Sequence, residues 1–386
     1  MRAVFRSTLF KVIVVAALLA VTLNLVIAVS RLGKGEIGEY SLVDEAYSFL
    51  DLHYIDPLPE QIQIEQGMVE GMVSSLDDPY TTYVEPSAHE IQRDDLIGEY
   101  GGIGAYLAIN DDDLVYLVPF EGSPAERAGV NEGDILLTVD GVDFEQGAPL
   151  DDVSAALRGP EGTIVMISVA ASSDGADERE YEITREVFPL QSVTSFLHPS
   201  DASVGVIVIR LFSERTPVEL DKAYRALVDR GAEALILDLR NNGGGLLGSA
   251  LSVAEFFLED GVILHEQQRD GDIVTHSVSS PGVGSSIPLA LLVNQYTASA
   301  AEVVAGAVQD HGRAPLIGET TFGKGSVQVI VELQDGSSLH ITSARWFTPN
   351  QRTLDGVGLE PEHPIMPAES GDAALEFALS WLSDQQ

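Results

Sequence analysis

Ser299 and Lys324 are the two residues whose types and surroundings best suit nucleophilic catalysis. Ser299 follows an apolar run that ends at Asn294 and precedes an alanine-rich, helix-forming stretch, so its hydroxyl would lie over the edge of a sheet. The N–H of Ala300, at the start of that helix, would face any oxyanion formed there. The alternative role for Ser299 is that of an N-cap, because Glu302 three residues later completes a capping box.

A serine hydroxyl needs a proton acceptor, and a neutral lysine amine is one. At its ordinary pKa of about 10.4 only about one lysine in 2,500 is neutral at pH 7, so burial must lower the pKa of Lys324 substantially. Lys324 lies between two glycines at the start of an apolar strand, and Gln328 on that strand could orient the amine without charging it. The alternative is an exposed loop lysine. Histidine offers no obvious base, since His311 and His340 are expected in a loop and on a strand surface.

Two glycine-rich segments resemble nucleotide-binding motifs but depart from them. Residues 243–248 fit G-x-G-x-x-G, yet Arg240-Asn241-Asn242 intervene between the strand and the glycines. Residues 318–324 begin as a Walker loop, but Gly325 stands where a Ser or Thr would bind Mg²⁺. The first segment still exposes N–H groups at a helix start, which suits an anion. The chain has no cysteine, which excludes disulfides, thiolate catalysis and Cys-ligated metals.

The segment from Asn294 to Gln328 resembles the signature of the tail-specific, or carboxyl-terminal-processing, serine proteases. Their motifs S-A-S-E, Q-D and F-G-K-G-x-x-Q are matched by residues 299–302, 309–310 and 322–328, with the family's spacing of 25 positions between nucleophile and lysine. Ala301 stands where the family often has a second serine, which leaves Ser299 as the nucleophile. The resemblance implies that Lys324 acts as general base and then acid, and that Gln328 orients it.

The resemblance extends over nearly the whole mature chain. Residues 77–83 resemble the family's D-P-x-S/T-x-Y segment, and residues 346–350 and 355–358 are also similar to it. Residues 237–245 resemble its D-L-R-x-N-P-G-G motif, with Gly243 in place of proline. The family takes one oxyanion-hole amide from this turn, which implies Gly244 or Gly245, and one from the residue after the nucleophile, Ala300. The implied fold is an α/β protease core of the Clp/crotonase-like class.

A middle segment resembles a PDZ domain, which would be inserted ahead of the protease core. The matching residues are 123–130, 133–136 and 139–141. Gly101, Gly102, Ile103 and Gly104 correspond to the loop whose amides bind a terminal carboxylate in such domains, the alternative being an ordinary glycine turn. Arg158 resembles an arginine that in some family members links PDZ docking to active-site alignment.

The hydrophobic pattern divides the chain into four predicted parts: a signal peptide or membrane anchor (1–30), a helical segment (36–97), a mainly-β PDZ domain (98–185) and the α/β serine protease core (186–386). Two helices are expected within 41–76, and short strands with one helix, 150–157, in the PDZ segment. From 203 onward strands and helices alternate, which indicates helices packed on a sheet. The expected elements there are strands 204–209, 234–239 and 289–294, helices 217–230, 246–258 and 300–309, and a hairpin over 326–347.

The first thirty residues indicate export. Arg2, Arg6 and Lys11 precede an apolar run, Val12–Val29, of nearly bilayer-spanning length, and residues 28–30 could be a cleavage site. A removable signal peptide and an uncleaved anchor both fit, and a buried core helix is the alternative. The positive-inside rule places everything after residue 30 outside the cytoplasm, most simply in a bacterial periplasm or on the outer face of the inner membrane.

Together these observations predict a serine endopeptidase that cleaves exported proteins near their C-termini through an acyl-enzyme. Its partners would be proteins with free, apolar C-termini, and an adaptor or a second copy of the chain is left open. A formal charge of −39 argues against nucleic acid as a partner. Membrane contact would occur only through the N-terminal segment, and neither cofactor nor metal is required. The alternatives are a non-catalytic PDZ scaffold (a pseudoprotease) and a crotonase-like enzyme acting on acyl thioesters.

Overall fold

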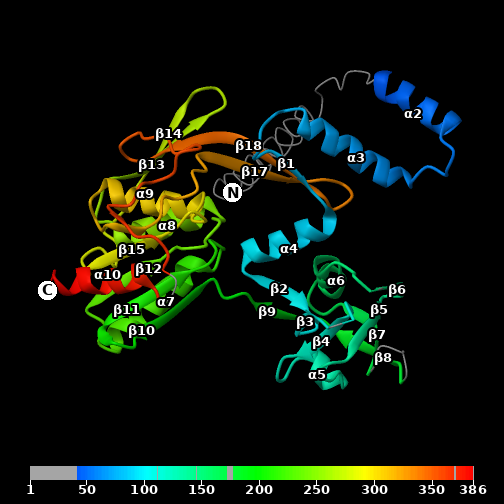
Figure 1. The fold of residues 1–386 in the computed structure, drawn as a ribbon, viewed down its shortest axis with the longest axis horizontal. Helices are drawn as coiled ribbons and strands as arrows, with labels where there is room; N and C mark the ends of the chain where they lie inside the picture. Colours follow the sequence, from blue (N-terminus) through cyan, green and yellow to red (C-terminus); the bar gives the residue numbers. More distant parts are fainter. Residues whose placement is uncertain (1–40, 111, 145, 172–176, 369–370, 386) are drawn as a thin grey trace, which may run out of the picture. The chain divides into compact units, whose positions relative to one another are not determined.

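The computed structural model in Figure 1 describes residues 41–110, 112–144, 146–171, 177–368 and 371–385. The chain falls into two compact units, Met1–Met68 and Val69–Gln386. The predicted signal peptide or anchor, residues 1–30, lies outside the described residues. None of the helices that the structure describes is long and apolar enough to cross a membrane.

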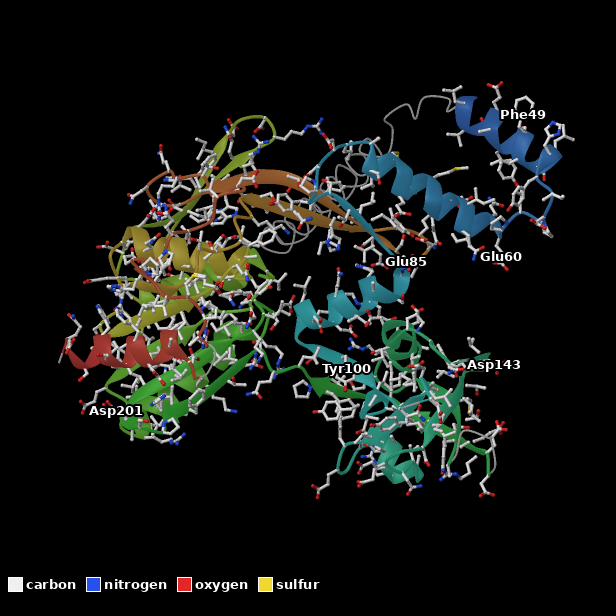
Figure 2. All side chains as sticks on the ribbon, in the orientation of Figure 1. Phe49, Glu60, Glu85, Tyr100, Asp143 and Asp201 are labelled. Carbon is white, nitrogen blue, oxygen red and sulfur yellow. The ribbon has the colours of Figure 1, made fainter. Side chains whose placement is uncertain are left out.

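Two helices account for the described part of the first unit: α2 (Ser41–His53) and the greater part of α3 (Gln61–Ser74). They confirm the two helices expected within 41–76. Apolar side chains on both remain exposed; Phe49, labelled in Figure 2, is 56% exposed. An apolar hollow of about 580 Å³ lies in this unit and is lined by Leu42, Val43, Ala46, Tyr47, Leu50, Tyr54, Leu58, Pro59, Ile64 and Met68.

A mostly parallel sheet of six strands lies at the centre of the C-terminal half. Its order is β10 (Val193–His198), β11 (Asp201–Ile209), β12 (Ala234–Asp238), β15 (Leu289–Val293), β16 (Leu316–Gly318) and β19 (His363–Pro364). β10 is antiparallel to β11, and the other neighbours are parallel. Because β12 and β15 are parallel neighbours, the segments that follow them, the glycine turn and Ser299, emerge at the same edge of the sheet.

Helices cover both faces of this sheet. α7 (Thr216–Asp229), α8 (Leu247–Phe257) and α9 (Ala300–Asp310) share one buried cluster with Leu235 and Leu237 of β12. α10 (Ala373–Ser383), red in Figure 1, packs with Ala234 and Ile236 of the same strand. Successive side chains of a strand point to opposite faces, so β12, which is buried along its whole length, supplies core to both layers.

A second, antiparallel sheet positions the Lys324 segment. Its order is β1 (Thr82–Val84), β18 (Ser338–Phe347), β13 (Val262–Gln268) and β14 (Ile273–Ser277), and β17 (Ser326–Glu332) pairs with β18. β17 and β18 form the hairpin expected over 326–347. Lys324 precedes β17 and Gln328 lies within it, so the hairpin fixes both residues relative to β18.

The middle of the chain forms a separate sheet with its own core. Its strands are β3 (Ala105–Ile109), β4 (Val115–Pro119), β5 (Ile135–Val139), β7 (Ile164–Ala170) and β8 (Arg179–Thr184), with β6 (Val142–Asp143) beside β5. α5 (Pro124–Ala128) and α6 (Leu150–Leu157) complete it, and its core includes Leu117, Leu136 and Ile167. The chain reaches this sheet through β2 (Glu99–Gly102) and leaves through β9 (Glu186–Pro189), and these two strands pair with each other.

Most of the expected elements are confirmed, and α6 and the β17–β18 hairpin have the expected bounds. Among the features that were not predicted are α4 (Pro86–Ile97), the hairpin β13–β14, α10, and the strands β10 and β16 of the central sheet. α4 opens with proline and is mostly polar, so its sequence carries little helical periodicity. It nevertheless contributes to the wall of the cavity that contains Ser299.

Candidate active site

Ser299 lies in the turn between β15 and α9 with a backbone φ of +54°. A positive φ is strained for a residue other than glycine and persists only where the surroundings impose it. Here hydrogen bonds to two other segments, 239–242 and the loop at 322, do so. The Ala298 N–H donates to the Asn242 carbonyl at 2.9 Å, and the Phe322 N–H donates to the Thr297 carbonyl at 3.0 Å. The hydroxyl of Thr297, which is fully buried, donates to the Leu239 carbonyl at 2.9 Å.

Glu302 joins the Ser299 turn to the Lys324 loop. Its carboxylate is fully buried and accepts four hydrogen bonds. One oxygen accepts the N–H groups of Ser299 (2.9 Å) and Lys324 (2.8 Å). The other accepts the Thr321 hydroxyl (2.6 Å) and the Gly323 N–H (2.7 Å). The capping box expected at the start of α9 is therefore only part of what Glu302 does, because it also holds the lysine loop against the serine.

Lys324 is held by neutral groups. Its Nζ donates to Gln328 Oε1, and Gln328 Nε2 in turn donates to the Tyr80 carbonyl. The Tyr80 ring centroid lies 5.4 Å from Nζ. Burial lowers the pKa of Lys324, and the charge of Asp78 opposes this only in part. The predicted contact between Gln328 and the amine is present, and Tyr80 was not anticipated as its support.

The glycine turn after β12 packs directly against Ser299. A Cβ added at Gly244 would lie 2.9 Å from the Ser299 Cβ, and one at Gly245 would lie 2.3 Å from the Phe212 carbonyl oxygen. Both glycines have φ values above +110°, so only glycine suits either position. The Gly244 N–H already donates to Asn242 Oδ1 at 2.9 Å. Of the two amides considered from the sequence, that of Gly245 is therefore the one left to an oxyanion.

These groups meet in a cavity of about 460 Å³. Its wall contains Ser299, Ala300, Lys324, Gln328 and Gly245. Much of the remaining wall is apolar and includes Leu211, Leu246, Leu247, Val303, Val327, Ile330 and Trp346. A serine, a lysine with a lowered pKa and a helix-start N–H in one largely apolar cavity are suited to acyl transfer.

Sequence reasoning missed two contributions to this cavity. His340 was expected on a strand surface, but it is half-buried and lines the cavity. Burial, followed by the charges of His89 and Lys324, lowers its pKa. Its Nε2 has no hydrogen-bond partner among the described residues. Gln92, Asp95 and Leu96 of α4 also line the cavity, and no signal in the sequence tied that segment to the site.

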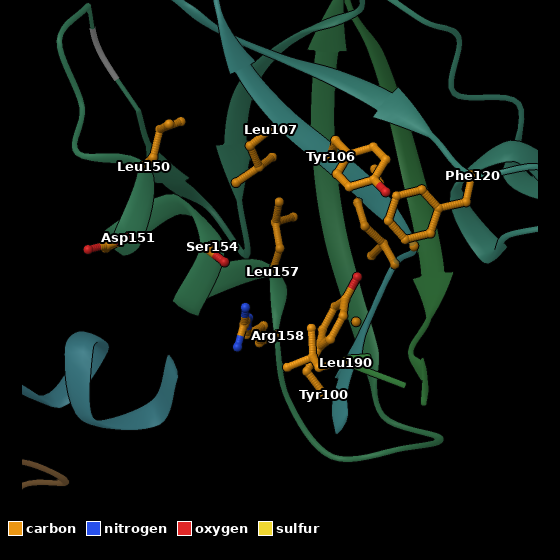
Figure 3. A pocket seen from close by; sticks show the side chains of 14 residues that line it. Tyr100, Tyr106, Leu107, Phe120, Leu150, Asp151, Ser154, Leu157, Arg158 and Leu190 are labelled. Atoms are coloured by element: carbon orange, nitrogen blue, oxygen red, sulfur yellow. The ribbon is translucent and has the colours of Figure 1, made fainter. Parts of the chain in front are cut away.

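A second pocket, of about 300 Å³, lies between β3 and α6 (Figure 3). Gly102, Ile103 and Gly104, three of the four residues of the predicted carboxylate-binding loop, line it. Gly101 does not; it packs against Gly159, whose carbonyl oxygen would lie 2.0 Å from an added Cβ. The rest of the lining is mainly apolar and aromatic and includes Tyr100, Tyr106, Leu107, Phe120, Leu157 and Leu190.

Arg158 is also in this pocket. Its guanidinium lies over the Tyr100 ring, 4.7 Å from the centroid, and its Nη1 is 3.2 Å from Asp94 Oδ2. Asp94 belongs to α4, and the next residue, Asp95, lines the cavity that contains Ser299. One helix therefore contacts the arginine of one pocket and forms part of the wall of the other.

Comparison with known proteins gives the family. The family model for peptidase family S41 matches residues 203–365, that for the PDZ domain matches 118–170, and that for the activating protease CtpB N-terminal domain matches 27–88. A probable CtpA-like serine protease of Staphylococcus aureus (strain COL) is 32% identical over 365 residues, which cover 94% of this chain and 72% of that protein. This chain belongs to peptidase family S41.

Further relatives agree with this. The carboxyl-terminal-processing protease of Synechocystis sp. is 36% identical over 301 residues, 77% of this chain and 70% of that protein. Among solved structures, the photosystem II D1 C-terminal processing protease matches with a TM-score of 0.50 and 30% identity, covering 89% of this chain and 97% of that chain. The present S41 peptidase is thus a serine-type peptidase of the carboxyl-terminal-processing group, with a PDZ domain and an N-terminal helical region.

The packing of the glycine turn in this S41 peptidase gives a testable prediction. Gly244→Ala should lower kcat by about 100-fold or more, because the new Cβ would displace Ser299, and small misplacements at a reacting centre are costly. Gly231→Ala is the control for backbone strain, since Gly231 has φ +96° but open space around it. Gly243→Ala, also in open space, is the control for position within the turn. Equal losses in Gly244→Ala and Gly243→Ala, measured by peptide cleavage, would contradict the packing account.

Proposed function

We propose that this chain is an exported endopeptidase that cleaves proteins near their C-termini, with Ser299 as nucleophile and Lys324 as general base. The observation that carries the proposal is the Glu302 carboxylate, which accepts the backbone N–H groups of both residues and so holds them at one cavity. The lowered pKa of Lys324 supports it further, because only a neutral amine accepts a proton.

The proposed reaction has two halves. Lys324 Nζ takes the proton of the Ser299 hydroxyl as Oγ bonds to the carbonyl carbon of the scissile peptide, and the carbonyl oxygen becomes an oxyanion. The N–H groups of Ala300 and Gly245 donate to that oxyanion. Lys324 then gives its proton to the leaving amine, the peptide C–N bond breaks, and the C-terminal fragment departs. Water, deprotonated by Lys324, attacks the acyl carbon. The ester bond to Ser299 Oγ then breaks, Lys324 returns the proton to Oγ, and the new C-terminus is released.

Gln328 would orient the amine throughout these steps. As a neutral side chain it fixes Nζ without adding a negative charge that would stabilise the ammonium form. Its own orientation is set by the Tyr80 carbonyl. A carboxylate in the place of Gln328 would raise the pKa of Lys324 and reduce the fraction of neutral amine.

The pocket between β3 and α6 is proposed to bind the substrate's C-terminal tail. Backbone N–H groups of residues 102–104 would donate hydrogen bonds to the carboxylate, and the tail's main chain would pair beside β3. The apolar lining favours an apolar final residue. Arg158 would link tail docking to the active site, because a bound carboxylate would compete with Asp94 for its guanidinium, and Asp94 belongs to the helix that lines the catalytic cavity.

Several finer assignments belong to the same proposal. The core is assigned to the Clp/crotonase-like class and the PDZ domain to an insertion at about residues 98–185, supported by the paired strands β2 and β9. Residues 1–30 are assigned to a signal peptide or anchor and the protein to the periplasm or the outer face of the inner membrane.

The exposed apolar side chains of α2 and α3 support a homo-oligomer, which sedimentation of the chain with and without residues 41–76 would test. An adaptor that activates cleavage is a further proposed partner.

Removing either member of the dyad should abolish cleavage. Ser299→Ala and Lys324→Ala are each expected to lower kcat/KM by at least about 100-fold, the lower end of the roughly 10²–10⁴-fold typical of a catalytic base. The thermal unfolding midpoint should change little. The double variant should be no worse than the worse single variant, because the two act as one unit. More than about a tenth of wild-type activity in Lys324→Ala would exclude it as the base. An inactive wild-type chain that still bound tails would favour a scaffold.

Activity should rise with pH as Lys324 loses its proton. The apparent pKa of kcat/KM should lie below the ordinary value of about 10.4, since burial lowers the pKa of this lysine. Asp78 raises that pKa, so Asp78→Asn should move the rising limb to lower pH. Asp77→Asn, which changes an exposed neighbour, is the control and should leave the profile in place. A profile that is flat from pH 5 to 10, or one that shifts equally in both variants, would argue against a titrating Lys324.

Tail recognition should depend on the free carboxylate. Amidating the C-terminus of a good peptide substrate should lower kcat/KM at least tenfold, because charge-assisted hydrogen bonds of about 1.5–3 kcal/mol each are lost. Gly104→Ala should remove the difference between acid and amide, since its Cβ would lie 2.5 Å from the Phe188 ring and 2.6 Å from the Ser123 Cβ. Gly122→Ala is a matched control, with φ +73° against +74° but open space. Equal kcat/KM for the wild type on both peptides would exclude tail reading.

A further inference from the structure

Arg240, the second residue after β12, is paired with two carboxylates: that of Asp238, at the end of the same strand, and that of Asp372, far away in the sequence. Asp238 accepts its Nε at 2.9 Å and its Nη2 at 2.6 Å. Asp372 accepts its Nη1 at 2.8 Å and its Nη2 at 2.8 Å. Bidentate ion pairing of this kind fixes the orientation of a guanidinium as well as its position. Asp238 belongs to the same strand end, so Asp372 is the partner that ties Arg240 to another element.

Asp372 is the N-cap of α10, the last helix of the chain. Its side chain accepts the Leu375 N–H at 3.1 Å in addition to the arginine. Burial would raise the pKa of Asp372, but hydrogen bonds from Arg240 and the Leu375 N–H outweigh this and lower it, so the carboxylate is charged at neutral pH. α10 is anchored to the sheet through Ala374, Ala378 and Leu382, all buried. The carboxylate is thus presented from a fixed helix start.

The turn that follows Arg240 leads directly to the nucleophile. Asn241 exchanges two hydrogen bonds with Asn294, at 3.0 and 2.9 Å. Asn242, fully buried, donates to the Ile209 carbonyl at 2.9 Å and accepts the Gly244 N–H. The Asn242 carbonyl accepts the N–H of Ala298, the residue before Ser299. The orientation of Arg240 is therefore linked, through this hydrogen-bonded turn, to the positions of Gly245 and Ser299.

We propose that Asp372 is a positioning residue for catalysis: through Arg240 it locks the glycine turn in the register that aims the Gly245 N–H at the oxyanion. This inference rests on the proposed function, because it presumes that Ser299 and the Gly245 amide take part in the reaction. α10 would then do more than pack on the sheet. Through the Asp372–Arg240 ion pair it would stabilise the transition state more than it strengthens substrate binding.

Asp372→Asn isolates this role from the structural one. Asparagine is about as good an N-cap as aspartate, so α10 keeps its cap, while the charge that holds Arg240 is lost. kcat should fall at least about tenfold, but by no more than the roughly 10²–10³-fold that follows complete removal of an oxyanion donor, and KM should stay within about twofold. The inhibition constant of a peptide aldehyde, whose adduct with Ser299 carries an oxyanion, should rise in parallel with the loss in kcat.

Three comparisons make the result decisive. Asp384→Asn removes an exposed carboxylate at the other end of α10 and should leave kcat unchanged. Arg240→Gln combined with Asp372→Asn should be no slower than Arg240→Gln alone, because Asp372 acts through Arg240. Ser299→Ala, assayed on the same peptide, tests the proposed function separately. An active Ser299→Ala would contradict the proposed function, whatever the effect of the Asp372 substitutions.

If Ser299→Ala is inactive, any of three outcomes would overturn the proposed positioning role of Asp372. The first is a kcat of Asp372→Asn within twofold of wild type. The second is a loss carried by KM with the aldehyde inhibition constant unchanged. The third is additive losses in the double variant. If Asp372→Asn proves too unstable to assay, Asp372→Ser, which also caps helices but cannot reach Arg240 in two-pronged fashion, replaces it under the same criteria.

Discussion

The candidate active site depends first on the burial of one carboxylate, that of Glu302. A buried charge is strongly unfavourable unless hydrogen bonds surround it, and Glu302 accepts four. Three of the donors are backbone N–H groups, from Ser299, Gly323 and Lys324. The chain can satisfy them only if the loop before β17 lies against the start of α9. The condition that makes the buried charge tolerable is therefore also the condition that assembles the serine and the lysine.

The same arrangement explains why a lysine can be neutral beside a carboxylate. The oxygens of Glu302 are occupied by backbone N–H groups and the Thr321 hydroxyl, whereas Lys324 Nζ donates to the neutral Gln328. Burial therefore lowers the pKa of the Lys324 amine, and the charge of Asp78 offsets this lowering only in part. The glycine turn completes the site, since Gly244 and Gly245 let backbone approach Ser299 and Phe212 more closely than any side chain would permit.

The sequence predicted what is local and failed on what is long-range. Ser299, Lys324 and Gln328 could be chosen from residue type and spacing, and the structure places all three at one cavity. Glu302 was seen only as a helix cap, because its contacts 19 to 22 residues away leave no periodic trace. α4 and α10 were not predicted as separate helices, although one lines the cavity that contains Ser299 and the other holds Arg240. Gly101 fitted the loop motif by position, but it packs against Gly159, in the loop after α6, a long-range contact that the motif does not encode.

The most direct test of this account is the protonation state of Lys324 itself. The chain has only four lysines, Lys11, Lys34, Lys222 and Lys324. Selective ¹³C labelling of the lysine ε-carbon therefore gives few NMR signals, and the one absent from Lys324→Arg is assigned at once. The account predicts that this signal titrates well below the ordinary pKa of about 10.4, while that of exposed lysines does not. Titration of the Lys324 signal at or above that value would contradict a neutral lysine acting as the base.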